Sequence, residues 1–241
     1  MKHVVALSGG KDSTAMALRL AEAEPRKYEY LITPTGNELP EMFEHWKRLA
    51  EMLGKPLTVL TCGKSLQRLI ADMRMIPNFR ARWCTRILKI EVAEQYLCAV
   101  APAVSYVGLR ADEEERQGMY GEIEGIVKRY PLREWGWKLS DVLGYLESRC
   151  IAIPTRTDCA WCFFQRIGEW WNLWKDYPGI FKQAEEIEAE VGHTFRTPGK
   201  DSWPTRLTDM RLKFEGGSRP RDAGQSDLFS GREGMCRACT L

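Results

Sequence analysis

The chain alternates between short apolar runs and longer stretches whose apolar residues recur at helical spacing. The short runs have the length of buried strands, and the longer stretches have the periodicity of helices with one face in a core. Strands are predicted at residues 3–7, 28–36, 56–62 and 103–111, with a short fifth strand within 128–135. Helices are predicted at residues 12–24, 39–54, 85–100 and 138–150.

This alternation predicts an α/β fold with a doubly wound, mostly parallel, five-stranded sheet that helices cover on both faces. Ligands of such sheets bind at the carboxyl ends of the strands. Polar residues lie at four of these ends, namely Ser8, residues 35–37, Cys62 and Arg110. We therefore expect them to share one crevice.

The pattern changes after the predicted α/β domain of residues 1–150. Residues 151–214 form an extension that is rich in Cys and Trp, with a helix predicted at 178–191. Residues 215–241 begin with a Gly/Ser/Arg-rich stretch and end in a CxxC sequence, so we expect a flexible tail. The chain is thus divided into a domain, a helical extension and a tail.

Composition narrows the class of protein. Of 241 residues, 44% are hydrophobic and 28% are charged, as in a globular protein. No apolar run approaches the ~20 residues of a membrane span. A charged loop follows the first strand too soon for a secretory leader, so we expect a cytoplasmic protein with no membrane partner. The net charge of +2 gives no general argument for nucleic-acid binding.

The first predicted strand runs directly into the sequence SGGKDS. Its members are Ser8, Gly9, Gly10, Lys11, Asp12 and Ser13. A glycine-rich turn before a helix presents backbone N–H groups to an anion, and the two glycines remove side chains that would block it. The lysine, which we expect to face solvent, adds positive charge; the serines add hydroxyl donors, and the aspartate could help hold Mg²⁺. A solvated turn that caps the helix is the simpler alternative.

Further blocks of sequence follow this loop in a characteristic order. They read TPTGNELPEM, WCTRILKI, YVGLRADEEER, YPLREW, DVLGYL and IAIP. Together with SGGKDS they resemble the phosphoadenosine phosphosulfate (PAPS) reductase-like family of the adenine nucleotide alpha hydrolases, also called N-type ATP pyrophosphatases or PP-loop proteins. The resemblance covers roughly residues 3–165.

The resemblance implies that the loop grips the phosphates of ATP, with Mg²⁺, and makes Lys11, Asp12 and Arg110 the candidate catalytic residues. It implies a nucleotide site built from Ser8, Gly9, Gly10, Lys11, Asp12, Ser13, Gly36, Gly108 and Arg110. In the ATP-cleaving members the bond between the α- and β-phosphates breaks, and AMP is placed on a substrate oxygen.

Three functions are compatible with this resemblance. The first is adenylation of a nucleic-acid or small-molecule acceptor for sulfur transfer, with a sulfur or electron donor protein as a further partner. The second is a thiol-dependent reductase of PAPS or its unphosphorylated analogue, and the third is a non-catalytic nucleotide-binding partner in a modification or defence complex. The complete SGGKDS loop, and the lack of the ECGIH-like segment of genuine PAPS reductases, favour the first.

The eight cysteines point to metal or redox chemistry, because disulfides are rare in the cytoplasm. The candidate metal ligands are Cys84, Cys159, Cys162, Cys236 and Cys239. Relatives that transfer sulfur to nucleic acids imply a [4Fe–4S] cluster, and Zn²⁺ is the alternative that spacing does not exclude. The last two cysteines could instead form a redox shuttle, and Cys150 could then supply the fourth ligand. Cys98, in an apolar context, is predicted to be a core residue.

Basic residues surround Cys84. They are Arg68, Arg74, Arg80, Arg82, Arg86 and Lys89. Such a group is either a solvated face or an anion site for phosphates or a nucleic-acid backbone. Trp170 and Trp174 could stack on a base, but their spacing of four residues is more typical of the buried stripe of a helix.

Overall fold

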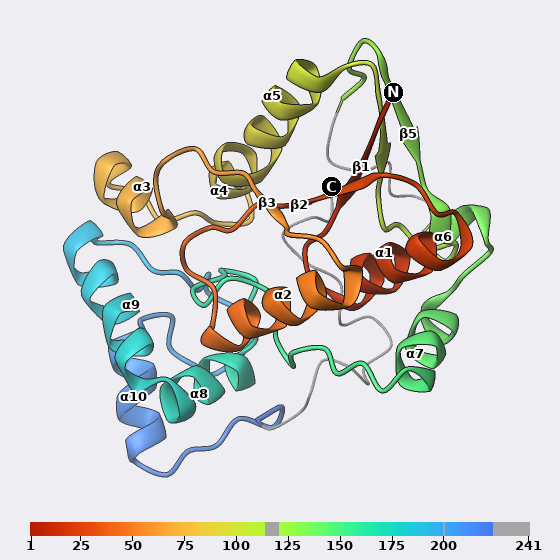
Figure 1. The fold of residues 1–241 in the computed structure, drawn as a ribbon. Helices are drawn as coiled ribbons and strands as arrows, with labels where there is room; N and C mark the ends of the chain where they lie inside the picture. Colours follow the sequence, from red (N-terminus) through yellow and green to blue (C-terminus); the bar gives the residue numbers. More distant parts are fainter. Residues whose placement is uncertain (114–120, 200, 224–241) are drawn as a thin grey trace.

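The computed structural model of the protein describes residues 1–113, 121–199 and 201–223. Five parallel strands form one sheet in the order β3-β2-β1-β4-β5 (Figure 1). Their bounds are Lys2–Ala6 for β1, Tyr28–Ile32 for β2, Thr58–Val59 for β3, Ala103–Tyr106 for β4 and Ile126–Arg129 for β5. The predicted five-stranded parallel sheet is therefore confirmed, and its first strand lies at the centre.

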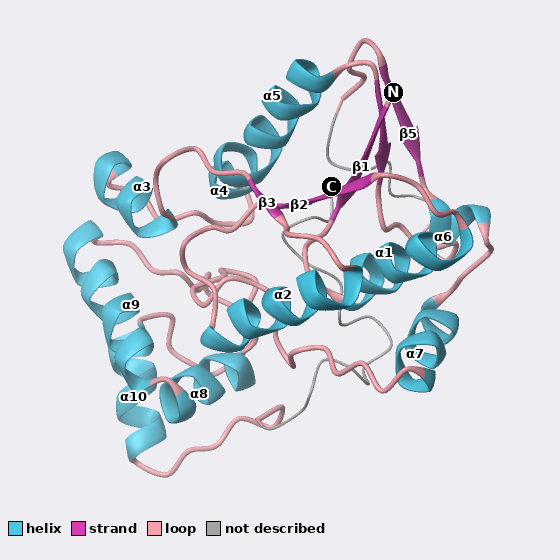
Figure 2. Cartoon of the chain, viewed as in Figure 1, coloured by secondary structure: helices cyan, strands magenta, loops and turns pink. Residues whose placement is uncertain are grey.

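Helices cover both faces of the sheet (Figures 1 and 2). One face carries α1 (Lys11–Ala23), α2 (Pro40–Leu53), α6 (Pro131–Glu134) and α7 (Leu139–Ser148). The other face carries α5 (Glu91–Val100), whose Leu97 packs with Val4 and Leu31. This arrangement buries both faces of the central strands, which explains why they read as short apolar runs.

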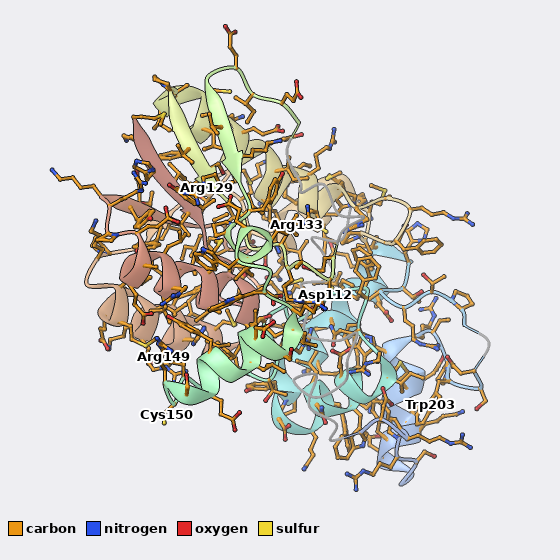
Figure 3. The ribbon with its side chains drawn as sticks, turned by 90° about the vertical axis from the view of Figure 1, so that its right-hand side faces the viewer. Asp112, Arg129, Arg133, Arg149, Cys150 and Trp203 are labelled. Atoms are coloured by element: carbon orange, nitrogen blue, oxygen red, sulfur yellow. The ribbon has the colours of Figure 1, made fainter. Side chains whose placement is uncertain are left out.

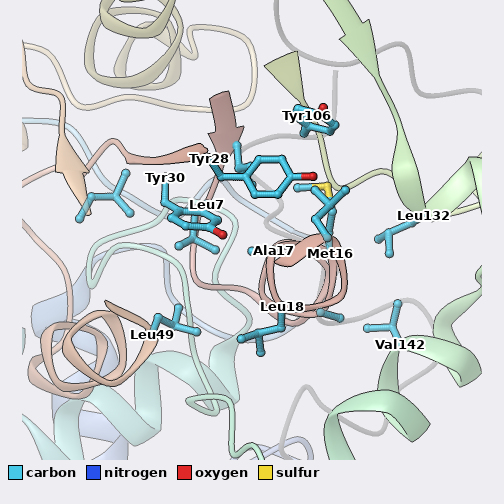
Figure 4. Packing of buried hydrophobic residues seen from close by; sticks show 14 of the residues in the cluster. Leu7, Met16, Ala17, Leu18, Tyr28, Tyr30, Leu49, Tyr106, Leu132 and Val142 are labelled. Atoms are coloured by element: carbon cyan, nitrogen blue, oxygen red, sulfur yellow. The ribbon is translucent and has the colours of Figure 1, made fainter. Parts of the chain in front are cut away.

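One hydrophobic core lies between the sheet and the helices on the face that carries α1 (Figure 4). Met16 of α1 is fully buried there, and the rings of Tyr28 and Tyr106 meet edge-on with their centroids 5.5 Å apart. Leu132 of α6 and Val142 of α7 close the same cluster. The packing fixes α1, and with it the loop between β1 and α1, against the sheet.

A second core joins the C-terminal extension to the segment that follows β3. Its helices are α3 (Leu66–Met73), α4 (Trp83–Thr85), α8 (Ile167–Asp176), α9 (Pro178–Val191) and α10 (Leu207–Glu215). Trp170 is completely buried, and Trp174 packs on Phe214 with ring centroids 5.5 Å apart. The two tryptophans thus form the buried helical stripe that their spacing predicts. The division of the chain at residue 150 stays a prediction.

Several predicted elements have different bounds in the structure. The second strand ends at Ile32. The fifth strand begins at Ile126 and ends at Arg129, because Pro131 starts helix α6. The helix predicted at 85–100 begins as a five-residue π-helix, η1 (Arg86–Ile90), and continues as α5. The prediction that Cys98 lies in the core is wrong: the stripe of buried residues on α5 passes beside this residue and leaves it exposed.

The described part of the predicted tail lies against the extension. Asp222 Oδ1 accepts a hydrogen bond of 3.1 Å from the backbone N–H of Gly168, at the start of α8, and Pro220 is buried. Cys236 and Cys239 lie outside the described residues. None of the helices in the described ranges combines the length and the apolar character that a membrane crossing requires.

Candidate nucleotide site and cysteine cavity

The SGGKDS loop follows the central strand β1 and leads into α1. Gly9 has a φ of +86°, and a Cβ at this position would lie 2.7 Å from Nε1 of Trp46. That nitrogen instead donates a hydrogen bond of 3.2 Å to the carbonyl of Ser8. Only glycine therefore fits this turn, because a side chain would meet both backbone strain and the Trp46 ring.

The two serine hydroxyls fold the loop onto the start of α1. Ser13 Oγ accepts a hydrogen bond of 3.2 Å from the N–H of Gly9, and Ser8 Oγ accepts one of 3.3 Å from the N–H of Gly10. The two hydroxyl oxygens lie 3.0 Å apart. Gly10 is the N-cap of α1 and has no side chain with which to cap it. The loop thus keeps its amide donors and the positive end of the α1 dipole together at the carboxyl edge of the sheet.

Lys11 does not face solvent, contrary to the prediction. Its side chain is only 2% exposed, and its Nζ lies 3.5 Å from Oδ2 of Asp12. The physical reason is that the first turn of α1 packs against the loop after β4, and the adjacent Asp12 carboxylate compensates the charge of the buried amine. Burial lowers the pKa of Lys11, and Asp12 opposes this effect.

Arg110 completes the charge network. Its Nη1 donates to both carboxylate oxygens of Asp12, at 3.1 and 3.0 Å, and its Nε donates to Oδ1 of Asp112 at 2.8 Å. Burial alone would lower the pKa of Arg110, but the charges of Asp12 and Glu113 outweigh it and raise the pKa. Burial raises the pKa of Asp12 against the opposing charges of Lys11 and Arg110. Two cations and three carboxylates are therefore held together beside the loop.

The two remaining glycines of the predicted site are points of close approach. A Cβ on Gly108 would lie 3.2 Å from both Cα and the backbone nitrogen of Ser13, so the loop after β4 packs directly on the first turn of α1. Gly36 has a φ of +73°, and a Cβ there would lie 2.8 Å from Cβ of Ser65. Both positions border the same edge of the sheet.

Glu38 has a structural role that sequence reasoning did not predict. Its Oε1 accepts hydrogen bonds from the N–H and the hydroxyl of Thr35, at 2.6 and 2.7 Å, and its Oε2 accepts one of 3.0 Å from the N–H of Gly36. The carboxylate therefore holds the turn after β2. The signal was present in the sequence, since a glutamate two residues after a TG pair can fold back on the amides of the turn.

Three of the predicted metal ligands lie together. Cys84, Cys159 and Cys162 line one small cavity of about 20 Å³, which Thr35 and Lys89 also line. Burial raises the pKa of Cys84. A hydrogen bond with Cys159, followed by burial, raises the pKa of Cys162.

The segment that carries Cys159 and Cys162 contacts both the turn after β2 and the SGGKDS loop. The N–H of Ala160, between the cysteines of the CxxC pair, donates a hydrogen bond of 2.6 Å to the carbonyl of Asn37 in the turn after β2. A Cβ on Gly10 would lie 3.6 Å from Oγ1 of Thr157, two residues before Cys159. A change at one site can therefore reach the other through a few residues.

The loop, the turn after β2 and the Arg110 segment all fall within one conserved domain type. The sequence profile of the phosphoadenosine phosphosulfate reductase domain matches residues 2–172. The chain belongs to this family. The resemblance stated from the sequence motifs is thereby confirmed, and the match ends inside α8, so most of the extension lies beyond it.

Individual relatives of this PAPS reductase domain protein are distant. An uncharacterized protein of Methanocaldococcus jannaschii is 25% identical over 204 residues, which are 77% of this chain and 47% of that protein. The chain thus spans about half the length of this curated relative.

Two solved structures are also similar. The PAPS reductase of Candida auris, in a phosphate complex, has a TM-score of 0.49 at 15% identity and covers 64% of this chain and 75% of its own. A predicted subunit of tRNA methyltransferase from Methanocaldococcus jannaschii has a TM-score of 0.35 at 18% identity and covers 63% of this chain and 90% of its own.

Three sulfur donors line the cysteine cavity of this family member. These side chains are of the type that ligates a metal ion or an iron–sulfur cluster. Among the described residues, however, no three His, Cys, Asp or Glu side chains are arranged as a metal site. Cys150 does not line the cavity; it lies exposed at the end of α7, beside Arg149 (Figure 3). The remaining candidates for a fourth ligand, Cys236 and Cys239, lie outside the described residues.

Proposed function

We propose that this chain binds ATP at the SGGKDS loop and cleaves it to AMP and pyrophosphate while adenylating an acceptor. The observation that carries the proposal is the buried network of Lys11, Asp12 and Arg110 directly beside a glycine turn at the N-terminus of α1. A turn of this kind is an anion site, and the network supplies both a cation for phosphate and a carboxylate for Mg²⁺.

The roles of the residues follow from their positions. The amides of Gly9 and Gly10 would exchange their hydroxyl partners for pyrophosphate oxygens, and the hydroxyls of Ser8 and Ser13 would then donate to the same oxygens. Lys11 would stabilise the charge that develops on the leaving pyrophosphate. Gly36 and Gly108 would keep the edges of the crevice free of side chains.

Within this network, Arg110 is the residue that holds Asp12 in place. Its guanidinium occupies both oxygens of the Asp12 carboxylate. Asp12 would hold Mg²⁺ through one of these oxygens, which would then no longer accept from Arg110. Arg110 would then have a free N–H for a phosphate oxygen.

The chemical step is written as an in-line displacement. An acceptor oxygen attacks the α-phosphorus, the bond from that phosphorus to the bridging oxygen breaks, and pyrophosphate leaves with the electron pair. AMP is then a good leaving group, and a sulfur nucleophile from a donor protein would displace it, forming a carbon–sulfur bond as the carbon–oxygen bond breaks. The acceptor is a nucleic acid or a small molecule.

The cysteine cavity supports a second part of the proposal. Cys84, Cys159 and Cys162, with Cys236 or Cys239, would hold a [4Fe–4S] cluster, or Zn²⁺ as the alternative. A cluster at this position would supply a site for sulfur or electrons next to the activated acceptor. Lys89, which lines the cavity, would offset the negative charge of the thiolates.

The second candidate function is reduction of PAPS or its unphosphorylated analogue by thiols, and the family itself favours it. The two functions differ in substrate and products. With ATP labelled on the α-phosphate, Mg²⁺ and pools of nucleic acid or small molecules as acceptors, adenylation predicts labelled AMP and free pyrophosphate. Release of sulfite from PAPS, with no AMP formed from ATP, would instead establish the reductase.

A further inference from the structure

A hollow of about 500 Å³ lies between two loops that the proposed function does not use. One loop, residues 75–80, connects α3 to α4, and the other, residues 193–198, follows α9. We call it the Phe79 hollow and define it by Asn78, Phe79, Arg80, His193, Thr197 and Pro198. Its volume lies in the range of ligand sites in proteins.

The loop presents an aromatic ring and a cation to this hollow. The side chain of Phe79 is 50% exposed, and the guanidinium carbon of Arg80 lies 5.3 Å from the centre of its ring. Asn78 fixes the turn, because its Oδ1 accepts hydrogen bonds of 2.9 and 3.0 Å from the N–H groups of Arg80 and Ala81. The backbone turn that carries the exposed ring is therefore formed before any ligand arrives, which lowers the entropic cost of binding.

The charge of the hollow is positive. Arg80 is exposed, and no carboxylate belongs to the described residues that line the hollow. Arg80 forms no ion pair within the described ranges, whereas Arg196, which forms part of the wall, donates hydrogen bonds of 2.9 and 3.0 Å to the carbonyls of Trp203 and Pro204. One arginine is thus committed to the fold, and the other remains available to an anion.

The hollow is a neighbour of the cysteine cavity. Pro77 lines the cysteine cavity, and the residues on either side of it, Ile76 and Asn78, line the Phe79 hollow. The 75–80 loop therefore forms a wall between them. A ligand in the hollow would therefore lie across this loop from Cys84 and its partners.

We infer that the Phe79 hollow binds an unpaired nucleobase together with its phosphate. The half-exposed ring of Phe79 offers a base the face that Arg80 does not cover, and the guanidinium on the other face offers a donor to the phosphate. The inference rests on the proposed function in one respect: the bound nucleotide would belong to the acceptor, as one unit of a single strand. A free mononucleotide offers the same chemistry, and the experiment distinguishes these two sources.

The test measures, by fluorescence anisotropy, the binding of a fluorescein-labelled single-stranded oligonucleotide of 12 nucleotides (the 12-mer) to the full chain. We expect Phe79→Ala to weaken binding about tenfold, because stacking of one base is lost. Arg80→Ala should weaken binding and reduce its dependence on salt by about one phosphate contact. Leu212→Ala is the control, because Leu212 is an equally exposed apolar residue, 57% exposed, on α10. All three residues are exposed, so the variants should fold, which their thermal unfolding will verify.

Competition identifies the source of the base. Failure of millimolar UMP or AMP to displace the 12-mer supports a polynucleotide ligand, and displacement by either at micromolar concentration supports a free nucleotide. Equal binding by the wild-type, Phe79→Ala and Arg80→Ala proteins would overturn the inference. Lys11→Met should lose ATP binding but keep the 12-mer, so a failure of the ATP proposal and a failure of this inference give different results.

Discussion

Nη1 of Arg110, in the loop after β4, donates hydrogen bonds to both carboxylate oxygens of Asp12, in the first turn of α1, at 3.1 and 3.0 Å. The two residues are 98 positions apart in the chain, and both are largely buried. Their contact ties the SGGKDS turn to the loop after β4. It also means that the site is already charge-paired before a nucleotide arrives.

Replacement of Arg110 should therefore affect the fold as well as the reaction. Arg110→Ala leaves the buried Asp12 carboxylate with only the Lys11 amine, and we expect the free energy of unfolding to fall by about 3 kcal/mol. Arg110→Lys keeps the charge but not the paired donors, so it should recover only part of this loss. Urea denaturation measures both. An Arg110→Ala protein as stable as wild type would show that the contact does not hold the loop.

Lys11 is buried, so its two roles can be separated by the shape of the replacement. Lys11→Met keeps the apolar stem and leaves Asp12 paired with Arg110, so the unfolding free energy should change by less than about 1 kcal/mol. Lys11→Ala also leaves a cavity and should cost about 2 kcal/mol. Both variants should lose most ATP binding. Wild-type affinity for ATP in Lys11→Met would rule out a role for the amine.

Gly108 provides a test of the close approach between the loop after β4 and α1. A Cβ there meets the backbone of Ser13 at 3.2 Å, so Gly108→Ala should displace the first turn of α1, lower the unfolding free energy by about 1–3 kcal/mol and weaken ATP binding. Gly144, inside α7, has no atom within 4 Å of the corresponding position. Gly144→Ala should therefore stabilise the protein by about 0.5–1 kcal/mol and leave ATP binding unchanged. Equal effects of the two substitutions would contradict this packing.

His45 should make stability depend on pH. The residue is 1% exposed on α2, and burial, then the charge of Arg48, lower its pKa to about 4 against the opposing effect of the Gly9 carbonyl. Between about pH 6.5 and 4 the unfolded chain binds a proton that the folded chain does not. This one group therefore lowers the unfolding free energy as the pH falls through that range, by up to about 3 kcal/mol.

Urea denaturation at pH 7.5, 6 and 5 measures this effect. The unfolding free energy of wild type minus that of His45→Phe should become smaller or more negative as the pH falls. His193→Phe, the same substitution at an exposed histidine, is the control for the loss of a histidine side chain. A flat difference for His45→Phe would mean that His45 titrates normally in the folded protein.

The cysteine cavity predicts the metal content of the protein. After purification without oxygen, we expect a brown protein with about four iron and four sulfide per chain. Cys159→Ser should lose most of both, whereas Cys98→Ser, a change of an exposed cysteine on α5, should lose neither. Stoichiometric zinc in a colourless preparation would establish the alternative, and equal iron in both variants would exclude the cavity as the site.

The presence of five parallel strands and the position of the loop could be predicted because they depend on local patterns. Buried strands need short apolar runs, and an anion-binding turn needs glycines between a strand and a helix. The exposure of Cys98 could also have been predicted, since Leu97 and Val92 define the buried stripe of α5 and Cys98 lies off it. Its apolar neighbours in sequence gave the wrong interpretation because helical spacing decides burial, not adjacency.

The burial of Lys11 and the Phe79 hollow could not be predicted in this way. The Asp12 carboxylate that compensates the buried Lys11 amine is shared with Arg110, which lies about 100 residues later in the chain. The hollow forms where residues 75–80 meet residues 193–198. Neither contact leaves a signal at one place in the sequence, because each depends on tertiary packing.

We expect the SGGKDS loop to hold the phosphates of ATP, and calorimetric titration of the full chain with ATP and Mg²⁺ measures this binding. One ATP should bind per chain, with the heat of binding lost in Lys11→Met and kept in Gly144→Ala. A wild-type protein that unfolds cooperatively but gives no heat of binding with ATP and Mg²⁺ would show that the loop is not an ATP site.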